Sequence, residues 1–323
     1  MSIESEVAAA AAGGNAPAIG VYGKVRSQPD FLRANAGEFS QAGLDRWFQD
    51  AVEIIRTEKT ALPPGPTGFV LTPAGSHQAV SFIGAFVPGV DAAGRTFPLS
   101  VFATIPASAV IDALPALPAI YARFVEAAGA IALAGAELSG PDLVAHAQAL
   151  GIDAPPLPTA ADADAAVAAL GAENAQVLAG AMGGARSALG YALRTCAMAC
   201  DQAAKTGPAG QGGVITIDAP APSAATRTLW LELARRRLKW RDAAPSLVWT
   251  GPDSARLLMT LGHPAPAALA YLANPRHRAP RFWPLRTEVG TAIESALKAL
   301  TPEQRRLVEN PASTLAELLN AFG

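Results

Sequence analysis

The sequence has few of the residues and motifs from which enzymes build reactive sites. Only two of its 323 residues are cysteine and four are histidine, and none of the histidines occurs in a His-x-x-x-His or Glu-x-x-His pair that would bind a metal. Cys196 and Cys200 are four residues apart on a predicted helix and lack the further ligands of a structural zinc site. The chain contains no Gly-x-Ser-x-Gly elbow, no Walker loop and no Gly-x-Gly-x-x-Gly motif after a strand. These absences predict a protein that is not an enzyme and that holds neither a metal nor a cofactor.

The chain also has little excess charge and no long apolar run. Its formal net charge is −2 at pH 7, which predicts no general attraction to nucleic acid. Its most apolar run, residues 127–136, is about half as long as the ~20 residues that cross a bilayer. The N-terminal residues MSIESE lack the cationic and apolar regions of a secretory signal. We therefore expect a cytoplasmic protein without direct membrane insertion; the sequence predicts no oligomeric state.

Half of the residues are apolar, and their spacing predicts an α/β fold of the α+β type. In the first lobe a strand at 18–25, an amphipathic helix at 39–58, a strand at 68–72 and a hairpin at 79–105 precede further helices. Parallel α/β units alternate strand and helix, so three successive strands predict a largely antiparallel sheet flanked by helices.

Composition divides the chain into four parts. We predict a flexible tail (1–16), a first lobe (17–138), an Ala/Pro-rich helical connector (139–182) and a second, smaller α/β lobe with C-terminal helices (183–323). The order strand, helix, hairpin, helix occurs in both lobes.

The hairpin at 79–105 has a well-defined turn. Asp91 can accept hydrogen bonds from the backbone that follows it, and Gly94 can take a positive φ, so Asp-x-x-Gly closes the loop between the strands. A second feature is a group of arginines interleaved with aromatic residues and prolines, which predicts a second basic interaction surface formed by Arg276, Arg278, Arg281 and Arg286.

Two stretches together resemble the TagF/ImpM family of type VI secretion accessory proteins. The first runs from Gly20 through Tyr22-Gly23-Lys24 and Asp30-Phe31-Leu32-Arg33 to Trp47. The second is Phe86-Val87-Pro88-Gly89-Val90-Asp91 followed by Gly94-Arg95-Thr96-Phe97-Pro98-Leu99. The resemblance covers residues 18–105 closely. It departs from the family at Gly89, where the usual residue is serine.

The resemblance implies a cytoplasmic protein that represses type VI secretion post-translationally, by binding the FHA-domain scaffold protein of the apparatus. The family-signature residues expected to be structural are Gly20, Tyr22, Gly23, Phe31, Trp47, Pro88, Asp91, Gly94, Phe97 and Pro98. The charged residues expected to contact the partner are Lys24, Asp30, Arg33 and Arg95. Two alternatives remain open: a hydrolase or nucleotide-binding enzyme with dispersed site residues, and a structural adaptor of the secretion baseplate.

Overall fold

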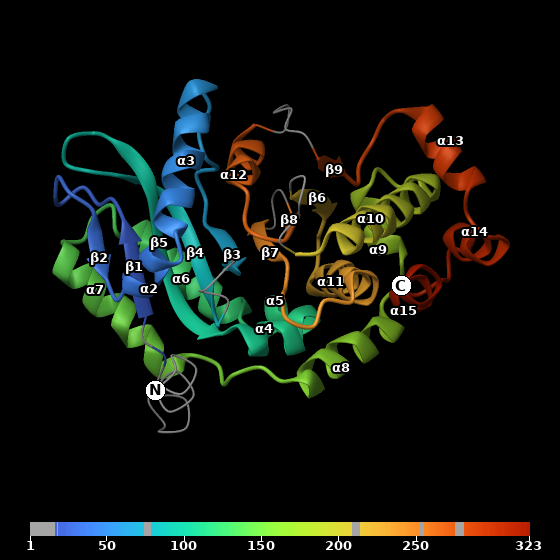
Figure 1. Cartoon of the computed structure of the whole chain (residues 1–323), viewed down its shortest axis with the longest axis horizontal. Coiled ribbons are helices and arrows are strands. Elements are labelled where there is room, and N and C mark those ends of the chain that lie inside the picture. The colour runs from blue at the N-terminus through green and yellow to red at the C-terminus, as the bar shows by residue number, and fades with distance from the viewer. Residues whose placement is uncertain (1–16, 18, 74–78, 209–213, 252–254, 275–280) are drawn as a thin grey trace.

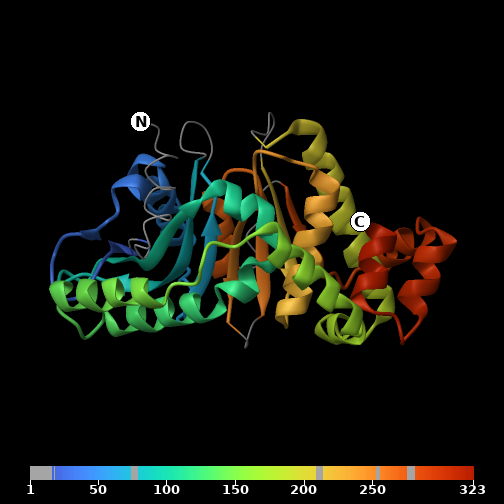
Figure 2. The same cartoon turned by 90° about the horizontal axis from the view of Figure 1, so that it is seen from below.

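One nine-stranded sheet runs through both halves of the chain and carries helices on its two faces (Figure 1, Figure 2). The computed structural model describes residues 17, 19–73, 79–208, 214–251, 255–274 and 281–323. The mixed α/β composition and the large, mostly antiparallel sheet confirm the predicted fold class. The tail predicted at 1–16 lies outside the described residues.

The sheet is built around the long hairpin. Every neighbouring pair of strands is antiparallel except β6 with β9, and the order is β2-β1-β5-β4-β3-β7-β8-β6-β9. The strands are β1 (Ile19–Gly23), β2 (Leu32–Ala34), β3 (Thr67–Leu71), β4 (Val80–Val90), β5 (Thr96–Pro106), β6 (Ile215–Pro220), β7 (Ser246–Thr250), β8 (Arg256–Leu261) and β9 (Phe282–Pro284). The predicted hairpin is β4 and β5, paired from Val80 opposite Pro106 to Val90 opposite Thr96.

The two predicted lobes share this sheet. β3 pairs with β4 on one side and with β7 on the other, and Val70 lies opposite Leu247 across the junction. All five residues of β3 and all five of β7 are buried. Strands buried on both faces pack hydrophobic side chains above and below the sheet, so the junction lies within the core and not at a surface.

One face of the sheet carries α2 (Gly37–Gln41), α3 (Leu44–Thr57) and α12 (Pro266–Ala273). The predicted helix at 39–58 is thus two helices, because Gly43 takes a left-handed conformation (φ 73°) between them. Trp47 and Phe48 on α3 pack into an aromatic core with Phe86 and Phe102 of the hairpin.

The remaining helices are α4 (Ala107–Ala113), α5 (Leu117–Ile120), α6 (Ala122–Ala134), α7 (Gly140–Ala149), α8 (Ala160–Ala169), α9 (Gln176–Ala181), α10 (Arg186–Thr206), α11 (Ala224–Leu238), α13 (Gly290–Lys298), α14 (Pro302–Glu309) and α15 (Leu315–Phe322). Most of them contribute residues to a larger core on the opposite face of the sheet. α7, α8 and α9 fall in the segment predicted as a connector. Of these, α7 packs against β1: the Gln148 amide donates to the Ile19 carbonyl (2.7 Å), and Leu143 is fully buried.

The repeated order of elements gives the same strand arrangement twice. In the first half β1, α3 and the β4–β5 hairpin lie in the order β1-β5-β4; in the second half β6, α11 and the β7–β8 hairpin lie in the order β6-β8-β7. The helix of the first unit belongs to one core and the helix of the second to the other. The two units are therefore related by a half-turn about an axis along the strands, which places their helices on opposite faces.

No single described helix is both long and apolar enough to cross a membrane. Taken together, the helical segments Ala107–Ile120 and Ala122–Ala134 are long and apolar enough to span a membrane. They meet at an angle of 67°, however, and do not form one straight helix.

Candidate interaction surface

The predicted turn at the hairpin tip forms around the Asp91 carboxylate. Oδ1 accepts hydrogen bonds from the backbone N–H groups of Ala93 (3.0 Å) and Arg95 (2.8 Å). The Gly94 N–H donates to the Asp91 carbonyl (2.9 Å), and Gly94 has a φ of 79°, which a residue with a side chain rarely adopts. The turn chemistry predicted for Asp91 and Gly94 is confirmed.

The second oxygen of Asp91 binds two cations. Oδ2 accepts from Lys24 Nζ and from Arg95 Nε, each at 2.7 Å. Burial of the carboxyl opposes its charged form, but the hydrogen bonds from Lys24, Arg95 and Ala93 outweigh burial and hold the pKa of Asp91 well below its ordinary range. The Lys24 side chain is 9% exposed, so its ammonium group serves this ion pair and is not free to contact a partner.

Arg95 ties the hairpin tip to the loop between β1 and β2. Its Nη2 donates to the Pro29 carbonyl (2.6 Å), and the Ala92 N–H donates to the Gln28 carbonyl (3.1 Å). The Arg95 side chain remains 60% exposed. It therefore combines a structural role with an accessible surface.

An aromatic platform lies beside this network. Tyr22 of β1 stacks on Phe31 (ring centroids 5.4 Å apart), and Phe97 meets Phe31 edge-on (4.8 Å). The guanidinium carbon of Arg33 is 5.6 Å from the Tyr22 ring centroid and 5.7 Å from that of Phe31, and Lys24 Nζ is 5.2 Å from the Phe31 centroid. Burial is the main reason for the raised pKa of Tyr22.

We name residues 22–33 together with residues 91–97 the hairpin corner. It contains the four residues expected to contact a partner, and the strands that its segments adjoin, β2, β1 and β5, are neighbours at one edge of the sheet (Figure 1). Arg33 and Asp30 are exposed there, whereas Lys24 is buried.

The other signature residues position the corner from below. Gly23 has a φ of 148°, and a Cβ atom at this position would collide with the Pro98 carbonyl oxygen. The Phe102 ring lies directly against the Cα of Gly20, and Pro88 faces Pro98 across the hairpin. Trp47 is buried in α3. Gly20 and Gly23 therefore set how closely β1 approaches the hairpin.

Sequence reasoning missed two supports of the corner. The Ser100 hydroxyl donates to the Tyr22 carbonyl (2.8 Å) from within β5, and its position as the one hydroxyl among the apolar residues 97–103 was the available signal. The carbonyls of Gln28 and Pro29, which accept from the hairpin tip, leave no signal, because every residue has a carbonyl.

The second predicted basic surface is only partly described. Arg276 and Arg278 lie outside the described residues. Arg281 is half-buried with a φ of 70°, its carbonyl accepts from the Thr216 N–H (3.1 Å), and Arg286 is exposed. The described part thus consists of one arginine with a structural backbone role and one exposed arginine.

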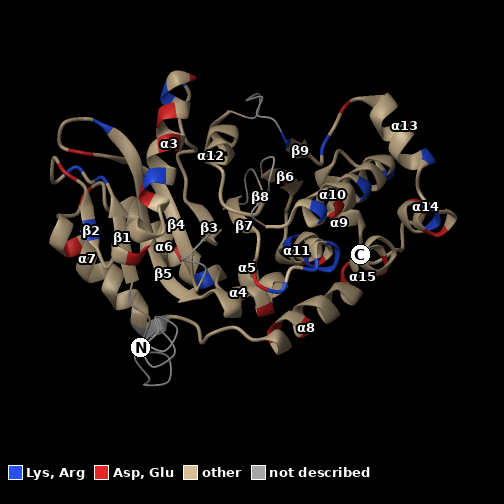
Figure 3. Cartoon of the chain, in the orientation of Figure 1, with Lys and Arg blue, Asp and Glu red and all other residues tan. Residues whose placement is uncertain are grey.

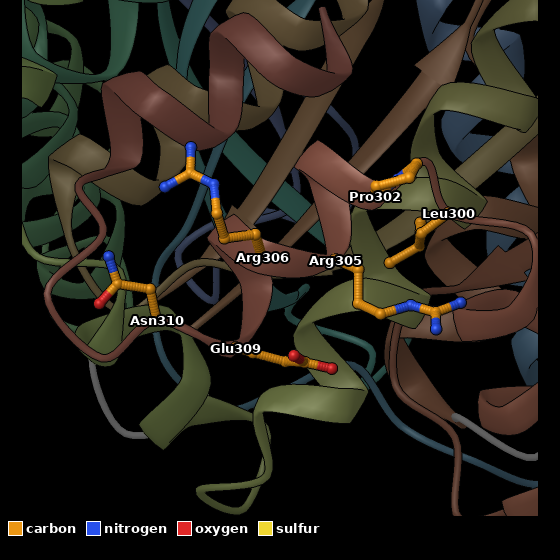
Figure 4. Close-up of a pocket in the computed structure, with 6 residues that line it drawn as sticks. All are labelled: Leu300, Pro302, Arg305, Arg306, Glu309 and Asn310. Carbon is orange, nitrogen blue, oxygen red and sulfur yellow. The ribbon is translucent and has the colours of Figure 1, made fainter.

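A shallow groove of about 570 Å³ lies on the outer side of α14. It is lined by Leu300, Pro302, Arg305, Arg306, Glu309 and Asn310 (Figure 4). The guanidinium groups of Arg305 and Arg306 point apart, and the Glu309 carboxylate lies nearer Arg305 (Figure 4). The groove therefore offers no set of donors that converge on one anion.

Among the described residues, no three His, Cys, Asp or Glu side chains gather as metal ligands would. Cys196 and Cys200 lie on one face of α10 and are fully buried. The hydrogen bond with Cys200 and burial raise the pKa of the Cys196 thiol.

Comparison with known proteins relates the first half of the chain to one family. No curated protein matches the sequence. Among solved structures, the crystal structure of PA0076 from Pseudomonas aeruginosa PAO1 resembles this chain with 19% sequence identity and a TM-score of 0.47, over 81% of this chain and 97% of that one. The model of the TagF N-terminal domain, described as type VI secretion system-associated, matches residues 20–150, which span β1 to β5 and α2 to α7. This match confirms the resemblance: the chain contains a TagF N-terminal domain, and the hairpin corner is part of it.

Proposed function

We propose that this protein represses type VI secretion post-translationally, from the cytoplasm, by binding the FHA-domain scaffold protein of the secretion apparatus. The observation that carries the proposal is the TagF N-terminal domain at residues 20–150. The repressor role and the FHA-domain partner come from the resemblance to TagF/ImpM proteins. The hairpin corner supports a binding role because it presents exposed arginines on a fixed framework.

We further propose that the protein acts without catalysis. Asp91 is the most strongly perturbed acid of the corner, but its lowered pKa makes it a weak base, and four donors already occupy its two oxygens. Lys24 and Arg95 are bound to that carboxylate. The ionisable groups of the corner therefore hold its shape, and Arg26, Asp30 and Arg33 are left to face solvent.

Secretion assays test the regulatory role. The type VI tube protein should appear in the culture medium in larger amounts when the gene is deleted and in smaller amounts when it is overexpressed, at unchanged transcript levels. A fall in secretion on deletion would contradict repression and favour a structural adaptor of the baseplate.

Ligand-induced stabilisation tests the absence of catalysis. A nucleotide that binds the folded protein, present at a free concentration 100 times its dissociation constant, would stabilise the fold by ~2.7 kcal/mol. A thermal-shift measurement would detect a stabilisation of this size. We expect no shift across a panel of nucleotides. A reproducible shift with one nucleotide would favour the enzyme alternative.

A further inference from the structure

The hairpin corner concentrates positive charge in a chain that is slightly acidic. Residues 22–33 and 91–97 contain four basic and two acidic residues, a net charge of +2, whereas the whole chain carries −2. Figure 3 shows basic positions on β2 and on the hairpin loop at this end of the sheet. One of the two acids, Asp91, is buried and already paired, so Asp30 is the only exposed carboxylate of the corner.

Two of its arginines have no acidic partner. Arg26 and Arg33 are both exposed, and neither forms an ion pair with any residue that the structure describes. Arg95 is paired through Nε but keeps most of its side chain exposed. A guanidinium group matches the two oxygens of a carboxylate, so these side chains favour acidic ligands.

Arg33 is also held in place before any partner binds. Its guanidinium lies against the stacked Tyr22 and Phe31 rings, and Phe97 supports Phe31 from the edge. A fixed side chain loses less conformational freedom on binding than a mobile one. Arginine and aromatic residues are also the types that contribute most to protein interfaces.

We infer that the hairpin corner binds an acidic, Asp- and Glu-rich segment of a partner protein, with Arg33 as the central contact and Arg26 and Arg95 beside it. The inference rests on the proposed function only for the identity of the partner; the acidic character of the bound segment follows from the charges and contacts of the corner. Binding buries no ionisable group without a counter-charge, because each carboxylate meets a guanidinium group.

A labelled peptide tests the chemistry directly. The probe is a fluorescein-labelled peptide rich in Asp and Glu, and its counterpart carries Asn and Gln at the same positions. With the full-length protein, fluorescence anisotropy should show binding of the acidic peptide that weakens as salt is added, and no binding of the amide peptide. Equal binding of both peptides, or binding of neither, would overturn the inference.

Single substitutions locate the site. Arg33→Gln should weaken binding of the acidic peptide about tenfold, the effect of one lost charge-assisted contact. Asp30→Asn should strengthen it, because a competing carboxylate is removed. Arg306→Gln makes the same change in net charge on α14, far from the corner (Figure 1), and should leave binding unchanged. An equal loss for Arg33→Gln and Arg306→Gln would show a nonspecific charge effect and contradict the site.

Two further measurements separate this inference from the proposed function. A phosphothreonine peptide without acidic residues should bind more weakly than the acidic peptide; binding of the phosphopeptide alone would overturn the carboxylate assignment. In a pull-down with the FHA-domain protein, failure of the unmodified protein to capture it would contradict the proposed partner while the peptide result stands. Capture by the unmodified protein and equally by Arg33→Gln would show that this partner does not dock at the corner.

Discussion

Asp91 connects three parts of the hairpin corner at the scale of a single residue. Its carboxylate binds its own turn, the end of β1 through Lys24, and the β1–β2 loop indirectly through Arg95. Charge-assisted hydrogen bonds of this kind are stronger than neutral ones, and buried members of such a network are costly to leave unpaired.

Asp91→Asn should therefore lower the stability of the fold. The amide can still accept from the turn, but the nearly buried Lys24 ammonium loses its counter-charge. Urea unfolding should show a lower midpoint for Asp91→Asn and partial recovery in the double variant Asp91→Asn/Lys24→Met, which removes the unpaired cation. Independent, additive effects of the two substitutions would contradict this account.

Stability should also depend on pH through Asp91. Its pKa is lower in the folded protein than the value of about 3.9 expected for an unfolded chain, so its contribution is complete above that value and declines as the pH falls toward the folded-state pKa. The difference in urea midpoint between the unmodified protein and Asp91→Asn should thus be constant near neutral pH and narrow in acid. A difference that widened on acidification would contradict the sign of the shift.

At the scale of elements, the contact between β1 and the hairpin depends on Gly23. Gly23→Ala combines an unfavourable φ of 148° with a collision between the new Cβ and the Pro98 carbonyl. Such strain costs on the order of 1–3 kcal/mol, and the collision adds to it. Gly37→Ala, at the first position of α2 where a Cβ meets nothing, is the matched control. Thermal unfolding followed by circular dichroism should show a clearly lower midpoint only for Gly23→Ala.

The elements with strong local patterns were predictable. The β4–β5 hairpin, its Asp91–Gly94 turn and the amphipathic α3 follow from residue spacing and turn chemistry. The break at Gly43 was missed, because its left-handed conformation splits a pattern that continues across it. The bond from Arg95 to the Pro29 carbonyl was not predictable either, since it depends on which loop the fold places beside the hairpin.

At the scale of the whole molecule, the pairing of β3 with β7 joins the two halves of the chain. The length and composition of the chain predicted two lobes. The pairing of β3 with β7 was not predictable, because strands that are buried on both faces do not specify their neighbours by pattern alone. For the same reason, the repeated order of strands and helices could be predicted from the sequence, but not that the strands of both halves form one sheet.

A fragment of residues 17–150 should therefore self-associate. Without β7, the outer edge of β3 exposes unpaired backbone groups on a strand whose residues are all buried in the full chain. Light scattering coupled to size-exclusion chromatography should show higher oligomers for the fragment than for the full chain at equal molar concentration. Elution of the fragment as a monomer would indicate that another part of it covers β3.

The burial of both cysteines in α10 makes the native protein suited to site-specific labelling. Thiol reagents require an accessible thiolate, and Cys196 and Cys200 are the only cysteines of the chain. The folded protein should thus stay unlabelled by maleimide until it unfolds. A cysteine introduced at the exposed position Arg26 would be the single reactive thiol, and a fluorophore attached there would report directly on what approaches the hairpin corner.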